Sequence, residues 1–134
     1  MKRIIPALIL TVGMSSMVSA KEVAGVQIPE SFNIDSQELA LNGAGIRTKL
    51  FMDIYVGGLY LKSATDNGDA IIAADDPMAI KLHVVSGLLT SDKMKAATIE
   101  GFDNSTGGKT ESVQAQIDQF IAVFDKEIVE NDVF

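Results

Sequence analysis

Beyond residue 20, the spacing of apolar and polar residues predicts strands in the first half of the chain and helices in the second. A short strand is expected over 23–28, ending at Pro29. The segments 39–49 and 51–61 are predicted to be extended, the second being richer in aromatic and β-branched residues. Strict alternation of apolar residues with Lys81 and His83 predicts a further, half-buried strand over 80–84.

Helical signals follow these strands. The turn-forming run at 66–69 precedes a short helix, and Ser91 is expected to cap a longer one that reaches about Phe102. Residues 104–109 are expected to form a loop. Apolar residues then recur at helical spacing and predict a last helix, ending near Glu130, with one wide apolar face: Val113, Ile117, Phe120, Ile121, Phe124 and Ile128. The predicted class is α+β, an antiparallel sheet with helices packed on it.

The first twenty residues are typical of an export signal. Two basic residues precede a mostly apolar run from Ile4 to Val18, and small residues end it at Ala20. We therefore predict a signal peptide over 1–20, cleaved before Lys21, and a mature domain over 21–134. In a Gram-negative cell the default destination is the periplasm. No later segment is long and apolar enough to span a bilayer, so no membrane contact is expected after cleavage.

Composition excludes several classes of function. The 134 residues suit a single domain, and they include no cysteine and one histidine. A disulfide framework, a cysteine nucleophile, a thiolate metal site and a multi-histidine metal cage are therefore excluded. The net charge of −7 argues against a nucleic-acid partner. Gly43-Ala44-Gly45 lacks the third glycine of a dinucleotide-binding motif, so no cofactor is predicted.

The most informative segment for chemistry surrounds Arg47. In a regular strand over 39–49, alternate side chains share one face, and two leucines mark that face as inward. The glycines on the same face would leave a trough for a ligand or another backbone. The residues assigned to this face are Leu39, Leu41, Gly43, Gly45 and Arg47. Arg47 would then project from the trough floor, where an unpaired guanidinium requires an anion.

The nearest acidic residue in sequence, Asp53, is not expected to supply that anion. The two residues lie about 20 Å apart if a single strand connects them. A hairpin would join them, but residues 48–52 contain no turn-forming Gly, Pro, Asn or Asp. The partner of Arg47 is then a distant carboxylate or a bound anionic ligand. A structural ion pair, or a bulge that turns Arg47 outward, remains an alternative.

Two tyrosines and one histidine are the other candidate polar groups. Tyr55 and Tyr60 are of opposite parity, so at most one faces the trough in a regular strand, although Gly57-Gly58 suggests a bulge between them. His83, on the mixed face of its strand, is expected to be structural.

The segments LNGAGIRTK (41–49) and YVGGLYL (55–61) resemble the bacterial chalcone isomerase-like family, and the resemblance extends over about 23–133. It implies an open-faced antiparallel β-sandwich with helices layered on one face and a ligand cleft between them. Members of the family continue with further strands and helices. Because Val133-Phe134 also reads as the start of another apolar element, we expect the domain to be incomplete at its C-terminus.

The family includes isomerases, which close a flavanone ring, and non-catalytic fatty-acid binders. Arg47 matches the arginine of both groups. In the isomerases a threonine, a tyrosine and an asparagine assist the reaction, and Tyr55, Met94 and Gly101 stand in their places. Met94 and Gly101 have no side-chain group that stabilises an oxyanion. The resemblance therefore implies no catalytic residues, and a binding site in which Arg47 with Tyr55 or Tyr60 holds an anionic head group.

Three functional hypotheses result. The first is a periplasmic, non-catalytic protein that binds a small anionic amphiphile such as a fatty acid. The second is an isomerase, an intramolecular lyase acting on an unknown enone. The third is a structural or partner-binding module without a ligand, in which Arg47 forms an internal ion pair. The sequence alone does not set the oligomeric state.

Overall fold

The computed structural model describes residues 20–134, and the predicted signal peptide lies outside the described residues except for Ala20. Two antiparallel sheets form, a two-stranded hairpin β1-β2 and a four-stranded meander in the order β3-β4-β5-β6. The strands are β1 (Ala20–Val23), β2 (Val26–Pro29), β3 (Ser31–Ile34), β4 (Gln37–Lys49), β5 (Met52–Leu61) and β6 (Met78–Val84).

A helical hairpin follows the sheet. It consists of α2 (Ser91–Thr106) and α3 (Gln114–Ile121), with single 3-10 turns η1 (Glu111–Val113) and η2 (Ala122–Phe124) flanking α3. The short helix α1 (Gly68–Ala73) lies earlier in the chain, between β5 and β6. The cap of α2 is Thr90, whose side chain accepts a hydrogen bond from the Lys93 backbone, rather than Ser91. The helix ends at Gly107, in the left-handed conformation that favours glycine. It therefore includes part of the segment predicted as a loop.

The last helix is shorter than predicted, because the chain returns to the sheet. Helical structure ends at Phe124, and the residues beyond it run back along the outer edge of β6. There the backbones of Leu82 and Phe134 exchange two hydrogen bonds, of 2.8 and 2.9 Å, and Asp132 accepts one from Val84. These hydrogen bonds satisfy part of a sheet edge that would otherwise be open. Ile128, which was predicted to lie on the last helix, belongs instead to this return segment, residues 125–134.

A hairpin joins β4 to β5, contrary to the prediction. Lys49 pairs with Met52, so Leu50 and Phe51 form a two-residue turn with φ of 51° and 64°. Such turns require the left-handed region at both positions, which glycine and asparagine adopt most easily. Here two bulky residues adopt it, at a cost of about 1–2 kcal/mol each. Because the usual turn residues are absent, the sequence did not predict this hairpin.

A β-bulge in β4 changes which residues share a face. The pairing shifts between Leu41 and Gly43, so that Leu41 lies opposite Tyr60 while Gly43 lies opposite Leu59. Asn42 is the extra residue, and its side chain accepts a hydrogen bond from the Thr65 backbone. Because adjacent strand residues point to opposite faces, the bulge separates the two leucines from the glycines that follow. The predicted face containing Leu39, Leu41 and Arg47 together is therefore wrong.

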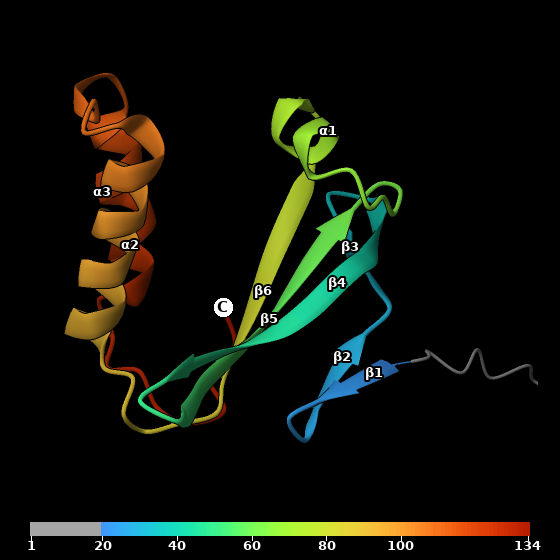
Figure 1. Cartoon of the computed structure of the whole chain (residues 1–134), viewed down its shortest axis with the longest axis horizontal. Coiled ribbons are helices and arrows are strands. Elements are labelled where there is room, and N and C mark those ends of the chain that lie inside the picture. Colours follow the sequence, from blue (N-terminus) through green and yellow to red (C-terminus); the bar gives the residue numbers. More distant parts are fainter. Residues whose placement is uncertain (1–19) are drawn as a thin grey trace, which may run out of the picture.

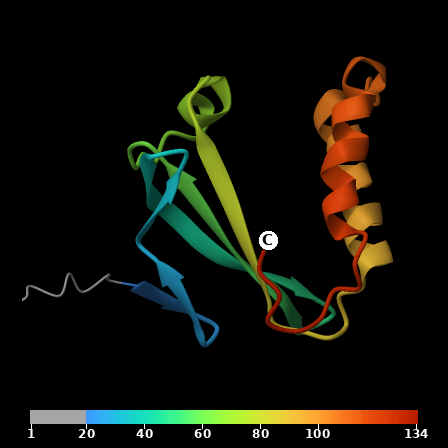
Figure 2. The ribbon, with the colours of Figure 1, turned by 180° about the vertical axis from the view of Figure 1, so that it is seen from behind.

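The two faces of the meander carry two hydrophobic clusters. The β1-β2 hairpin lies on one side of the sheet, and α2 and α3 stand on the other (Figures 1 and 2). On the β1-β2 side, the buried residues are Ile28, Leu39, Val56 and Tyr60. Leu39 and the later glycines thus belong to opposite layers of the molecule.

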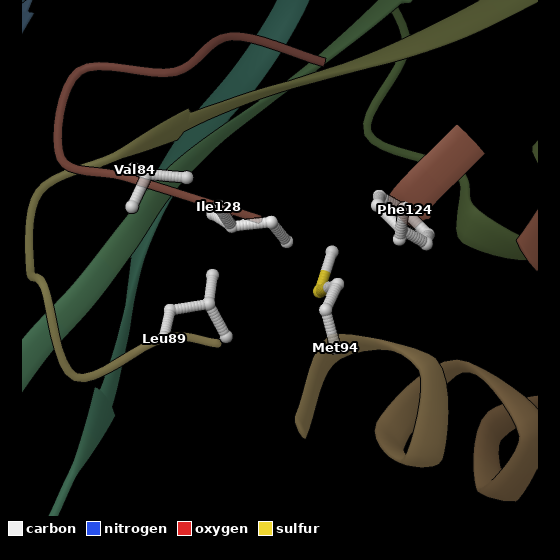
Figure 3. Close-up of a cluster of buried hydrophobic side chains, with 5 residues drawn as sticks. All are labelled: Val84, Leu89, Met94, Phe124 and Ile128. Atoms are coloured by element: carbon white, nitrogen blue, oxygen red, sulfur yellow. The ribbon is translucent and has the colours of Figure 1, made fainter. Parts of the chain in front are cut away.

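The second cluster ties the helical hairpin to the end of the sheet (Figure 3). Its buried members come from β6, the following loop, the first turn of α2, η2 and the return segment, and their side chains point toward one another: Val84, Leu89, Met94, Phe124 and Ile128. The aromatic rings of Phe124 and Phe134 meet edge to face, with centroids 5.1 Å apart. Among residues 20–134, no helix has the length and apolar character needed to cross a bilayer. The α+β class and the helices on one face of an antiparallel sheet are confirmed.

Candidate functional site

An apolar cleft lies between the helical hairpin and the sheet. Its volume is about 440 Å³, within the range of small-molecule sites. The sheet contributes Tyr55, Ile80 and Leu82, and the return segment contributes Phe134. The helices supply the opposite wall: Met94, Ala97, Thr98, Phe120, Val123 and Phe124. Polar groups are few on this lining, and the cleft therefore suits a hydrocarbon chain.

The predicted glycine trough is present on the same face of the sheet. Gly43, Gly45 and Gly57 line a shallow hollow of about 380 Å³ together with Leu59 and Ile80. Gly45 and Gly57 are directly opposite each other on β4 and β5. An added Cβ at Gly43 or Gly45 would meet no atom within 4 Å. Because Ile80 lines both hollows, the trough and the cleft adjoin.

Arg47 lies on this face but is exposed, not buried. It pairs across the strands with Tyr55, which lines the cleft, so the two side chains leave the same face about 5 Å apart. Within residues 20–134 its guanidinium has no ion pair or side-chain hydrogen bond. Asp53, brought near by the hairpin, instead accepts a hydrogen bond of 3.0 Å from Thr48. Of the alternatives left open for Arg47, an internal ion pair is not seen among the described residues, and the expected interior position is wrong.

Tyr60 lies outside the candidate site, on the opposite face of the sheet. It is fully buried in the cluster on the β1-β2 side, and its hydroxyl donates a 2.8 Å hydrogen bond to the Pro29 carbonyl. Burial raises the pKa of its phenol above the ordinary value. The opposite parity of Tyr55 and Tyr60 was predicted and is confirmed, since the pairing stays regular through Gly57-Gly58. Tyr55 alone remains beside Arg47.

Two of the three positions that the resemblance aligns with catalytic groups of the isomerases, Met94 and Gly101, have no polar side chain. Met94 is buried in the second cluster, and its side chain borders the cleft. Gly101 lies exposed on α2 and lines neither the cleft nor the trough. His83 lies opposite Val56, on the face away from the cleft, with its ring nitrogen 3.4 Å from the side-chain oxygen of Asn131. That placement fits the structural role expected for it.

A separate hollow between α2 and α3 is less suitable for an anionic ligand. Its volume is about 500 Å³, but the carboxylates of Glu100 and Asp103 line it. Like charges would oppose a bound acid there. In the described part of the chain, no three acidic or histidine side chains gather closely enough to hold a metal ion.

Sequence reasoning missed the helical wall of the cleft. Phe120 and Phe124 were assigned to an apolar helix face, which was correct, but that pattern does not distinguish a packed face from one lining a hollow. The side of the cleft formed by the sheet could be predicted in part, because the alternation of Ile80 and Leu82 with polar residues marks one apolar face of β6. Which of the two faces of the sheet held the glycines depended on the bulge at Asn42.

Comparison with solved structures finds the same fold in a fatty-acid binding protein of Arabidopsis thaliana. The TM-score is 0.59 at 20% sequence identity, and the alignment covers 81% of this chain and 66% of that one. The chain thus spans less than two thirds of the length of that relative. A comparison with curated protein sequences finds no match.

The family comparison is more extensive. The model of a family described as chalcone isomerase-like matches residues 20–134, which include both hairpins of the sheet, the trough, and the helical hairpin. The match covers all the residues that form the cleft. The chain belongs to the chalcone isomerase-like family.

Proposed function

We propose that this protein binds a small anionic amphiphile, such as a fatty acid, without converting it. The observation that supports this most is the apolar cleft of about 440 Å³ between the sheet and the helices, continued by the glycine trough. A hydrocarbon tail would lie in these hollows, with its head group toward Arg47 and Tyr55. The similarity in fold to a fatty-acid binding protein agrees with this proposal.

Because Arg47 is exposed, its contribution to the binding free energy should be small. A guanidinium in contact with water pairs with a carboxylate only weakly, and salt screens that attraction. Burial of the tail against the cleft lining would therefore provide most of the binding energy, at about 25 cal/mol per Å² of apolar surface. The arginine would select for an acid over a neutral amphiphile.

The proposed absence of turnover rests on the cleft lining. In the cleft lining, which also includes Tyr55, Met94 stands where the resemblance places a hydrogen-bonding group of the isomerases, and Gly101 does not line the cleft. Enone cyclisation needs groups that stabilise a developing oxyanion. A rate of chalcone cyclisation above the uncatalysed rate would contradict this part of the proposal.

The direct test places a negative charge where both hollows meet. Because Ile80 is 68% exposed, we expect the fold to tolerate Ile80→Asp, whose carboxylate would face a bound tail. We expect the affinity for palmitate, measured by displacement of a fluorescent fatty acid, to fall by about tenfold or more. The matched control is Ile72→Asp on α1, where the side chain is 85% exposed and outside both hollows. Equal affinity in both variants would contradict the proposed site.

Arg47 is tested separately. Arg47→Gln should weaken palmitate binding about two- to fivefold at low salt, and the difference should shrink as salt is added. Arg47→Lys should keep most of the affinity, and a neutral fatty alcohol should bind the wild type and Arg47→Gln equally. An identical loss for acid and alcohol would indicate a structural role for Arg47.

We also propose that the protein is exported, and in a Gram-negative cell periplasmic. Support comes from the basic start, apolar run and small residues of 1–20. Intact mass of the protein purified from the periplasmic fraction tests this, with the expected chain beginning at Lys21. A protein recovered only from the cytoplasm with its first residues in place would overturn it.

A further inference from the structure

The tip of the β4-β5 hairpin is the most exposed apolar feature of the described chain. Phe51 is 103% exposed, Leu50 76% and Met52 43%. The tip projects at the end of the sheet that also carries the loop from β6 to α2, on the far side from α1 (Figures 1 and 2). That loop adds Leu88, which is 46% exposed. Four exposed apolar side chains, those of Leu50, Phe51, Met52 and Leu88, thus lie at this end of the molecule.

The backbone of this turn is strained for the residues that occupy it. Leu50 and Phe51 both have positive φ, at 51° and 64°. Asparagine and glycine would adopt the same turn with less strain and would expose less apolar surface. No packing within residues 20–134 offsets the strain, because neither side chain is covered. Folding alone therefore does not explain two apolar residues at the tip.

The charges beside the tip favour a negatively charged surface. Lys49 and Arg47 flank the turn and are exposed. Asp53, across the hairpin, accepts a hydrogen bond from the neutral hydroxyl of Thr48 and keeps its charge, so residues 47–53, with two cations and one carboxylate, carry a net charge of +1. This local basic character contrasts with the net charge of −7 for the whole chain. Apolar side chains next to lysine and arginine are the combination that inserts into the interface of an anionic bilayer.

We propose that Leu50, Phe51 and Met52 insert into the surface of an anionic phospholipid membrane, with Lys49 and Arg47 at the level of the head groups. A projecting tip of this kind suits lipid, which closes around a convex group. The expectation of no membrane contact after cleavage considered spanning segments only, and this is a peripheral mode. Because Arg47 also belongs to the proposed ligand site, the membrane proposal is tested on protein without fatty acid and through Lys49, Leu50 and Phe51, which have no part in that site.

The test is co-sedimentation of exported, mature protein with vesicles containing equal parts phosphatidylglycerol and phosphatidylcholine. The double variant Leu50→Asn/Phe51→Gly should partition about tenfold less, and it should keep its thermal transition because Asn-Gly suits this turn. The matched control Ile72→Gln removes an equally exposed apolar side chain from α1 and should bind as the wild type does. Lys49→Gln should weaken binding to these vesicles but not the residual binding to pure phosphatidylcholine.

A spectroscopic reading complements sedimentation. The chain has no tryptophan, so Phe51→Trp introduces a single reporter at the tip. Its emission should shift to the blue on addition of the anionic vesicles, and that of Ile72→Trp should not. Wild-type protein that stays in the supernatant, or a double variant that binds equally well, would overturn the proposal. So would a wild-type dimer that the double variant converts to a monomer, because the tip would then contact a second copy.

Discussion

At the scale of single residues, the structure decides which of the three candidate site residues lie on the cleft face. Arg47 and Tyr55 leave the sheet on the cleft face, whereas Tyr60 lies on the opposite face with its hydroxyl bonded to Pro29. The parity of the tyrosines could be predicted because it depends only on their spacing in one strand. The exposure of Arg47 could not, because it depends on what packs above β4, and nothing in residues 39–49 encodes that.

The buried phenol of Tyr60 should make stability sensitive to alkaline pH. Its pKa is raised by burial, so the folded protein holds this proton more tightly than the unfolded chain, whose value is near 10. The resulting stability is present below about pH 10 and is lost as pH rises through the folded pKa. Tyr60→Phe should lower the free energy of unfolding by about 1 kcal/mol at neutral pH, because the Pro29 carbonyl loses its donor.

Urea unfolding of the two proteins across this range measures the effect. The gap between wild type and Tyr60→Phe should narrow as the pH rises above about 10, since the wild type alone loses the contribution of the protonated phenol. Tyr55→Phe serves as the control, because the Tyr55 hydroxyl has no side-chain hydrogen bond among the described residues. A gap that stays constant with pH would show that Tyr60 ionises alike in both states.

At the scale of elements, the periodicity of apolar residues predicted which strands and helices form better than it predicted how the strands pair. The predicted strands over 39–49, 51–61 and 80–84 correspond to β4, β5 and β6, and the helix from Ser91 to α2. The bulge at Asn42 and the turn at Leu50-Phe51 were missed. Both are set by the partner strand: the register decides which residue is extra, and the paired strands hold the turn residues in left-handed conformations that they do not prefer.

The glycine trough of β4 gives a prediction that separates binding from folding. Gly45→Val adds a side chain to the trough at a position where an added Cβ would meet no protein atom within 4 Å, and valine suits a strand better than glycine. We expect unchanged or slightly higher stability and about tenfold weaker binding of palmitate, because the added bulk would overlap the tail. The control Gly101→Val makes the same change on α2, outside both hollows, and should leave affinity as it is. Unchanged affinity in Gly45→Val would place the tail elsewhere.

At the scale of the whole molecule, the four-stranded meander separates the two hydrophobic clusters. The cluster around Ile28 fixes the β1-β2 hairpin to one face, and the cluster around Ile128 fixes the helices and the return segment to the other. Only the second cluster touches the cleft, through Met94 and Phe124. The width of the cleft therefore depends on how firmly the return segment and η2 are held against β6.

This division predicts different consequences for the same substitution in the two clusters. Ile128→Val and Ile28→Val each remove one methylene from a side chain that is 4% or 5% exposed, and each should cost about 0.5–1.5 kcal/mol. Ile128→Val should speed amide hydrogen exchange at Leu82, Val84 and Phe134, whose hydrogen bonds join the return segment to β6, and should weaken palmitate binding. Ile28→Val should speed exchange in β1 and β2 and leave binding unchanged. Equal effects of both substitutions on exchange and affinity would mean that the two clusters unfold as one cooperative unit, and that the cleft is not held by its own side of the sheet alone.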